Sequence, residues 1–231
     1  VDIVAHSLGG LVSKYYIKHL SSGSVDEFID IATPHLGAPK AFKILMYGDD
    51  LGIKFLGQSI LNSERVKIIS QNMPSVYELL PSYNYFDTTN PDYNYYLFDV
   101  EDVDNNGVKG RLDHNQTGEF LKNSGRNSLL LDDADSLHQD LDSWRGADFG
   151  VKTYNIVGCG APTIGKILVV NKEASGFEYG LSYINGDATV PLRSAESVGA
   201  DKTYYVNSVE HATMPSANGI RQLVASILVN Q

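Results

Sequence analysis

Cysteine is nearly absent from this sequence, and so is any long apolar run. One of the 231 residues is cysteine, Cys159, which excludes an internal disulfide framework. Cys159 follows an apolar stretch and lies between two glycines, so we interpret it as a buried, chemically inert thiol. No apolar run approaches the roughly 18 residues that span a bilayer, and the sequence therefore predicts no transmembrane segment.

Positive charge is also scarce. The 18 lysines and arginines face 28 aspartates and glutamates, giving a net charge of −10. This balance argues against nucleic acid or an anionic membrane as an electrostatic partner. The composition is that of an ordinary globular domain, and the length allows a substantial core. The lone cysteine leaves the compartment open, and we favour an extracellular or cell-surface location.

The sequence opens on Val1 rather than methionine, inside an apolar β-type run. We therefore expect a C-terminal part of a longer protein, with earlier strands upstream of Val1. Residues 1–5 and 28–31 read as strands, and residues 11–20 between them show helical spacing of apolar side chains. Strand, helix and strand within about 32 residues predict a βαβ unit and hence a parallel sheet.

Later segments continue the alternation of strands and helices. We predict the following elements: strands at 151–158 and 203–206, a hairpin joining 167–170 to 177–179, and a last helix over 218–229.

Residues 36–148 interrupt this pattern. Helical spacing predicts helices over 59–71 and 127–144, and two similar aromatic segments at 83–87 and 93–99 predict a hairpin. We interpret 36–148 as a cap or lid inserted into a single domain and covering one end of its sheet. Its aromatic side chains either line an acyl groove or form the small core of the insertion. They are Tyr77, Tyr83, Tyr85, Phe86, Tyr93, Tyr95, Tyr96 and Phe98.

Ser7 lies in the segment Ala-His-Ser-Leu-Gly-Gly between the first strand and the first helix. A serine at such a sharp turn is held above the sheet as an exposed nucleophile. We expect the small residues Ala5 and Gly9 to be required because the strand and helix backbones nearly touch. The helix N-terminus and the Leu8 N–H can stabilise a developing oxyanion.

A nucleophilic serine needs a base, and the base needs an orienting carboxylate. In α/β hydrolases the chain order is Ser, then Asp or Glu, then His. Asp187 lies in a turn after the predicted strand at 181–184, and His211 lies between the last strand and the last helix. The sequence therefore predicts Ser7, Asp187 and His211 as a catalytic triad.

Four segments carry a resemblance to a known family. They are Ala-His-Ser-Leu-Gly-Gly at 5–10, Thr-Pro-His-Leu-Gly-Ala-Pro at 33–39, Leu-Leu-Pro-Ser at 79–82 and Gly-Asp-Ala-Thr-Val-Pro at 186–191. In this order they resemble the lecithin:cholesterol acyltransferase family of α/β hydrolases, including its bacterial lipase-like members. The resemblance runs from residue 1 to about 215 and is weakest over 99–150.

This resemblance implies an α/β-hydrolase fold with Ser7 as nucleophile, Asp187 as orienting acid and His211 as general base. The family cleaves acyl esters of lipids, and some members pass the acyl group to an alcohol. The loop that gives the second oxyanion donor would lie upstream of Val1. We therefore expect residues 1–231 alone to be poorly active, since losing one such donor typically costs about 10²–10³ in turnover.

A second motif lies inside the insertion. Residues 102–113 fit the spacing of a calcium loop, with oxygen ligands at the first, third and fifth positions, a backbone carbonyl at the seventh and a carboxylate at the twelfth. The candidate ligands are Asp102, Asp104, Asn106, Val108 and Asp113. The alternative is an acidic Asn-Gly turn that binds no metal.

The sequence thus predicts a serine esterase, lipase or O-acyltransferase with a lipid or acyl-ester substrate. It needs no cofactor for its chemistry, with a structural calcium ion as an addition, and its cap contacts a lipid surface peripherally. Two alternatives stay open. One is a non-catalytic, calcium-binding surface or scaffold module on the same fold, and the other is a peptidase or thioesterase.

Overall fold

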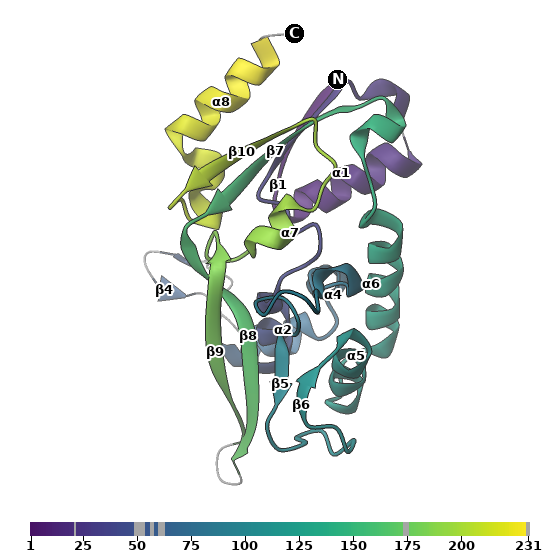
Figure 1. Ribbon diagram of the computed structural model, residues 1–231, viewed down its shortest axis with the longest axis vertical. Helices are drawn as coiled ribbons and strands as arrows, with labels where there is room; N and C mark the ends of the chain where they lie inside the picture. The colour runs from purple at the N-terminus through teal and green to yellow at the C-terminus, as the bar shows by residue number, and fades with distance from the viewer. Residues whose placement is uncertain (21, 49–53, 56–57, 60–62, 173–175, 230–231) are drawn as a thin grey trace. The chain divides into compact units, whose positions relative to one another are not determined.

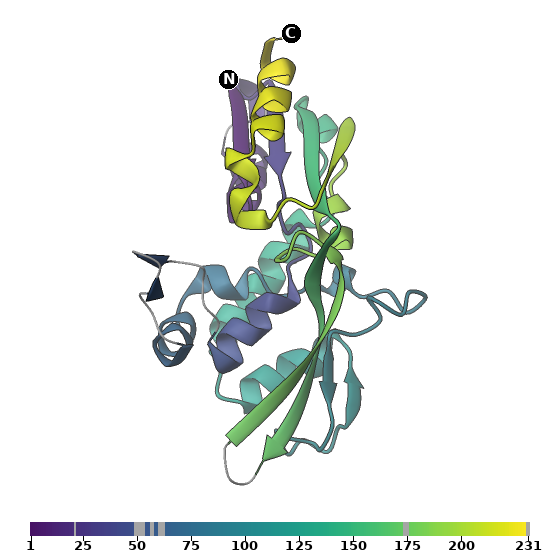
Figure 2. The same ribbon diagram turned by 90° about the vertical axis from the view of Figure 1, so that its left-hand side faces the viewer.

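The computed structural model describes residues 1–20, 22–48, 54–55, 58–59, 63–172 and 176–229. The chain divides into two compact units (Figures 1 and 2). The first unit comprises residues 1–36, 138–163 and 184–231, and the second comprises 37–137 and 164–183. Within the described residues, no helix is long and apolar enough to cross a membrane.

A four-stranded parallel sheet forms the centre of the first unit. Its strands, in spatial order, are β1 (Asp2–His6), β2 (Glu27–Ile31), β7 (Lys152–Cys159) and β10 (Lys202–Asn207). Its helices are α1 (Leu8–His19), α7 (Leu192–Glu196) and α8 (Asn218–Val229), with short 3₁₀ turns η1 (Ser22–Ser24), η3 (Gly146–Phe149) and η4 (His211–Ser216). Because the strands are parallel, all their carboxyl ends lie along one edge of the sheet.

The alternation of side chains along β2 explains the two layers of core. Ile29 and Ile31 point to one face and pack with Ile220 and Ile227 of α8. Phe28 points to the other face and joins a second cluster. That cluster contains Ile17 of α1 together with Val25, Trp144 and Val151. Figure 2 shows α8 and α1 with the strands of this sheet. Both faces of β2 are therefore buried, as its continuous apolar run requires.

The second unit combines short helices with a mixed sheet. Its helices are α2 (Pro39–Tyr47), α3 (Ser63–Ser70), α4 (Pro74–Tyr77), η2 (Tyr83–Tyr85), α5 (His114–Asn123) and most of α6 (Ser128–Leu141). Its strands are β5 (Leu97–Asp99), β6 (Gly110–Leu112), most of β8 (Ala161–Lys172), most of β9 (Gly176–Gly186) and the two-residue pair β3 (Lys54–Phe55) and β4 (Gln58–Ser59). The larger sheet has the order β6-β5-β8-β9.

The predicted aromatic hairpin is wrong. Residues 83–85 form the 3₁₀ turn η2, and β5 pairs antiparallel with β6 and parallel with β8. Tyr77, Tyr85 and Tyr96 are instead almost completely buried. Tyr85 meets the rings of Tyr93 and Tyr96 edge-on at 5.6 and 6.4 Å. Four of the eight aromatic side chains, Tyr77, Tyr85, Tyr93 and Tyr96, are therefore buried within the second unit, where edge-to-face contacts stabilise the rings.

Other predicted elements are confirmed, namely the first strand and helix, the strand at 28–31, the helix within 127–144 and the strands at 151–158 and 203–206. The last helix has the predicted bounds, and β8 and β9 are neighbours in the sheet as expected. The predicted helix over 59–71 is seen from Ser63, and its part at 60–62 lies outside the described residues. Cys159 is partly exposed rather than buried. That residues 36–148 act as a cap stays a prediction.

Candidate active site

Ser7 occupies a strained turn between β1 and α1. Its φ of 56° and ψ of −132° place a non-glycine residue where L-amino acids rarely lie. The backbone around it is held from two sides. The Ser7 N–H donates to the Ile31 carbonyl at 3.0 Å, and the Ser7 carbonyl accepts from the Gly10 N–H at 2.9 Å. The turn therefore keeps the predicted nucleophile at the carboxyl end of the sheet, as expected for a nucleophile elbow.

The glycine that the elbow requires is not the one the sequence suggested. A Cβ added at Gly9 would make only an ordinary contact, 3.7 Å from the Ala5 Cβ. A Cβ added at Gly10 would overlap the Thr33 hydroxyl and lie 2.7 Å from Asp30 Oδ1. The close approach is thus between α1 and the end of β2 with the nearby Thr33, and it occurs one position farther along the motif than predicted.

Asp187 and His211 are tied together by side chain and backbone. His211 Nδ1 lies 2.8 Å from Asp187 Oδ2, and the His211 N–H donates to the Asp187 carbonyl at 2.9 Å. The other carboxylate oxygen, Oδ1, accepts from the N–H groups of Thr189 at 3.0 Å and Val190 at 2.6 Å. Asp187 is fully buried, so these donors supply the hydrogen bonds that water would otherwise provide.

The loop that carries Asp187 is built around Thr163. The Thr163 hydroxyl accepts from the Ala188 N–H at 2.9 Å, and Ala188 has a positive φ of 73°. A Cβ at Gly186 would meet the Val190 carbonyl and the Thr163 hydroxyl, so only glycine fits there. The turn is therefore fixed by its own sequence and by Thr163 near the start of β8.

The structure brings the three predicted residues into one chain of hydrogen bonds. His211 Nε2 lies 2.8 Å from Ser7 Oγ, on the far side of the ring from Asp187. With Nδ1–H donated to the carboxylate, Nε2 is left as an acceptor for the serine hydroxyl proton. This arrangement can take a proton from Ser7 and stabilise the imidazolium that results.

His6 also contacts the imidazole of His211, which sequence reasoning did not anticipate. Its Nε2 lies 3.0 Å from the His211 carbonyl oxygen, so the ring donates there, and the two ring centroids are 4.6 Å apart. Burial, and next the neighbouring His211, lower the pKa of His6 below its usual value of 6.5. The residue's place beside Ser7 was the one available signal, and its partner 205 residues away could not be inferred from it.

The other histidines are engaged elsewhere. His35 bonds to Asp30, His19 to Asp140 and His138 to Asp142 within the first unit. In the second unit, His114 lies 3.2 Å from Asp135. Leu8, the predicted oxyanion donor, is the first residue of α1, and N–H groups of a first helical turn lack acceptors within the helix.

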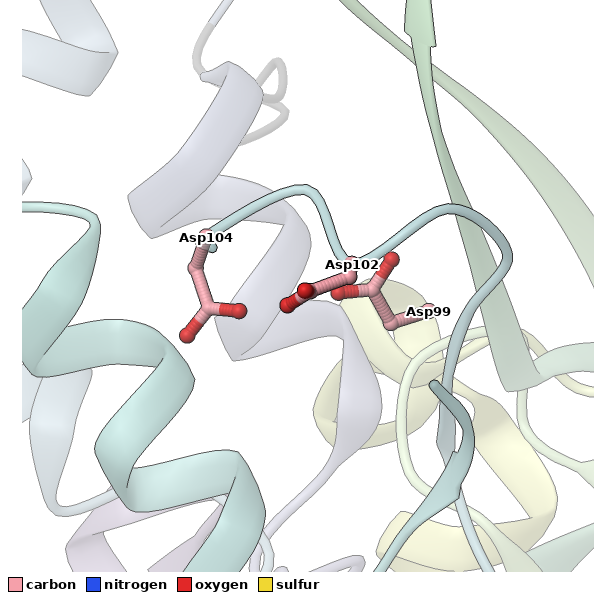
Figure 3. Close-up of side chains that lie close together, drawn as sticks. All are labelled: Asp99, Asp102 and Asp104. Atoms are coloured by element: carbon pink, nitrogen blue, oxygen red, sulfur yellow. The ribbon is translucent and has the colours of Figure 1, made fainter. Parts of the chain in front are cut away.

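Part of the predicted calcium loop gathers three carboxylates. Asp99, Asp102 and Asp104 each offer a ligand oxygen within 4.8 Å of the others (Figure 3). Asp99 was not predicted as a ligand. Its burial raises the pKa of its carboxyl group, although N–H groups of Val103 and Glu101 oppose that shift.

The remaining predicted calcium ligands have other contacts. Asn106 donates to Asp104 Oδ2 at 2.7 Å and accepts from the Val108 N–H at 2.8 Å. Asp113 caps α5, accepting from the Gln116 N–H at 2.9 Å, and it does not belong to the group of three carboxylates. A calcium ion at this loop stays a prediction.

Comparisons with known proteins agree on a family and a fold. The model of the family described as lecithin:cholesterol acyltransferase matches residues 1–129. A comparison with curated proteins found no match. A chain in the crystal structure of the Tle4–Tli4 complex is similar in fold, with a TM-score of 0.56 and 14% sequence identity, over 91% of this chain. This chain spans 55% of the length of that one.

Proposed function

The chain belongs to the lecithin:cholesterol acyltransferase family, and on that premise we propose that it acts on acyl esters of lipids as a serine hydrolase or acyltransferase. The predicted resemblance is confirmed by the family match, and the predicted α/β-hydrolase fold class by the likeness of the folds. The observation that carries the proposal is the hydrogen-bonded chain from Ser7 Oγ through the His211 ring to the buried Asp187 carboxylate.

In the proposed mechanism, His211 Nε2 accepts the Ser7 hydroxyl proton while Ser7 Oγ attacks the ester carbonyl carbon. The carbonyl oxygen becomes an oxyanion that the Leu8 N–H helps to stabilise. The tetrahedral species then expels the alcohol, which takes the proton from His211, and an acyl-enzyme remains on Ser7. Water or a second alcohol attacks the acyl group, so the same residues serve hydrolysis and transfer.

Asp187 supports each of these proton transfers. Its Oδ2 accepts the Nδ1–H of His211 and so fixes the ring in the tautomer whose Nε2 is free to act as a base. The carboxylate also stabilises the positive imidazolium that forms in both steps. Its two backbone donors, Thr189 and Val190, hold it in position while charge develops.

Labelling with a fluorophosphonate tests the role of Ser7. We expect the chain to be labelled on Ser7, and the Ser7→Ala variant to lose the label completely, because the probe bonds only to an activated hydroxyl. Ser216→Ala is a matched control, since Ser216 is exposed in the same unit and its hydroxyl donates to the Thr213 carbonyl. Equal labelling of wild type and Ser7→Ala would overturn the proposal.

A series of substrates separates the chemical alternatives. Hydrolysis that rises with the acyl-chain length of esters supports a lipid ester as substrate, whereas a preference for thioesters or peptides assigns the same residues to a thioesterase or peptidase. A non-catalytic calcium-binding module would show none of these activities and no labelling. Exposed apolar side chains of the second unit, Ile68, Ile69 and Leu129, support the proposal that this part of the chain contacts a lipid surface.

A further inference from the structure

We propose that Thr33 is a positioning residue that holds the Ser7 elbow through its hydroxyl group, an inference that rests on the proposed function. Thr33 Oγ1 lies 2.9 Å from the Ser7 carbonyl oxygen and is completely buried. It belongs to the segment Thr-Pro-His at 33–35, whose role the triad leaves unexplained.

The Thr33 contact acts where the backbone is strained. The Ser7 carbonyl belongs to a residue with positive φ, and its second donor is the Gly10 N–H. A strained conformation persists only where surrounding contacts over-determine it. The Thr33 hydroxyl adds a contact from outside the helix, so it fixes the orientation of the Ser7–Leu8 peptide group, which also carries the Leu8 N–H.

A buried set of polar groups holds Thr33 itself. Its hydroxyl also bonds to Asp30 Oδ1, so one hydroxyl hydrogen faces two acceptors, the carboxylate and the Ser7 carbonyl. Asp30 Oδ2 accepts from His35 Nε2 at 2.5 Å. Burial lowers the pKa of His35, so its ring is neutral and donates its single N–H to this carboxylate.

Lys14 of α1 adds positive charge to the same buried region. Its side chain is completely buried, and the charges of Asp142 and Asp30 oppose the lowering of its pKa. The donor from His35 and the charge of Lys14 both compensate the Asp30 carboxylate. The Thr33 hydroxyl group bridges this compensated carboxylate and the Ser7 carbonyl oxygen.

The shape of α1 agrees with this role. Gly10 is the position where any side chain would overlap Thr33 Oγ1 and crowd Asp30 Oδ1, whereas Gly9 has room for a methyl group. The absence of a side chain at Gly10 thus leaves the space in which Thr33 contacts the elbow. The segments at 5–10 and 33–39 are therefore in contact at Gly10 and Thr33, which explains structurally why both occur in this chain.

The test measures the rate of fluorophosphonate labelling in the full chain. Thr33→Val keeps the shape and removes the hydroxyl, and we expect labelling to slow roughly tenfold and ester kcat to fall with little change in KM. Thr33→Ser restores the hydroxyl and should recover most of the rate. Thr153→Val is the control, because Thr153 is an equally buried threonine and lies on β7.

A second pair of variants makes the test independent of the threonine. Gly10→Ala should slow labelling at least as much as Thr33→Val, because its methyl group displaces Thr33 from the elbow. Gly9→Ala adds the same methyl one residue earlier and should slow labelling less. Thermal melts of every variant separate slow labelling of folded protein from unfolding.

The outcomes distinguish the two proposals. Wild-type labelling at Ser7 together with an unchanged rate in Thr33→Val overturns the positioning role alone. If labelling of Thr33→Val is slow and Thr33→Ser does not recover the rate, the positioning role is also overturned, because loss of the hydroxyl is then not the cause. Absence of labelling in the wild type overturns the proposed function, and the positioning role falls with it.

Discussion

At the scale of single residues, His6 connects the strand that leads to the proposed nucleophile with the loop of the proposed general base. It donates from Nε2 to the His211 carbonyl and packs its ring against the His211 ring, with centroids 4.6 Å apart. Because His6 directly precedes Ser7, the same strand end holds both partners of the proposed proton transfer. Two contacts of His211, one with His6 and one with Ser7, therefore define the distance between Ser7 Oγ and His211 Nε2.

Replacing His6 by phenylalanine keeps an aromatic ring and removes the donor. We expect kcat/KM for a soluble ester to fall up to about tenfold, because one neutral hydrogen bond contributes about 1 kcal/mol and here orients the base. The measurement is steady-state kinetics. His19→Phe is the control, because His19 lies on α1 and bonds to Asp140 instead. If both variants kept wild-type kcat/KM, His6 would have no part in orienting His211.

The lowered pKa of His6 also predicts how the free energy of unfolding changes with pH. The folded state prefers the neutral ring, so this preference contributes fully above pH 6.5, the ordinary pKa, and is lost as the pH falls from there through the lower folded value. The free energy of unfolding of the wild type should therefore drop more steeply below pH 6.5 than that of His6→Phe.

At the scale of elements, the end of β5 brings Asp99, which the predicted spacing left out, beside Asp102 and Asp104 of the following loop. Asp99 ends β5, and Asp102 and Asp104 follow it in the loop. Asp113 instead begins α5 through a capping box with Gln116. The cap uses Asp113 Oδ1 as an acceptor, so this oxygen would have to leave the Gln116 N–H to bind a metal ion.

Calcium titration calorimetry tests this loop. We expect binding that Asp102→Asn weakens at least tenfold, because a carboxylate charge is removed from a small set of oxygen ligands. Asp92→Asn, an exposed aspartate of the same unit, is the control. Asp113→Ala distinguishes the two possible sets of calcium ligands. It abolishes calcium affinity if the twelve-residue loop 102–113 binds the ion, and it leaves the affinity unchanged if Asp99, Asp102 and Asp104 bind it. Absence of binding heat in the wild type would remove the calcium site altogether.

At the scale of the whole molecule, stability depends on a buried lysine. Lys14 is completely buried, and burial lowers its pKa from 10.5 to about 8. Between these two values the unfolded chain binds more protons than the folded one, so the free energy of unfolding rises with pH. The folded protein is thus penalised near neutrality for holding this charge away from water.

Comparing the wild type with Lys14→Met isolates this effect. From the shift between 10.5 and about 8, the difference in free energy of unfolding should change in favour of the wild type by about 3 kcal/mol between pH 7 and pH 11. Urea unfolding at several pH values measures it, and Lys202→Met on the exposed start of β10 is the control. A difference that stays constant across this range would contradict the burial of a charged Lys14.

Much of the fold was predictable from sequence because its signals are local. The βαβ unit, the serine turn and the last helix follow from residue spacing over a few turns of chain, and they have nearly the predicted bounds. The aromatic hairpin failed because residues 83–87 and 93–99 carry rings that are buried equally well in a turn and in a strand. The partners of β5 are β6 and the distant β8, which no local pattern specifies.

The sequence by itself determined the parallel sheet, the elbow and the order of Ser7, Asp187 and His211, because short motifs encode strained turns and strand ends directly. Only the tertiary structure decided that His6 donates to His211, that Thr33 joins the local Gly10 N–H at the Ser7 carbonyl, and that Asp99 lies beside Asp102. Each of these depends on strand register and on packing across the fold, where a shift of one residue turns a side chain to the opposite face.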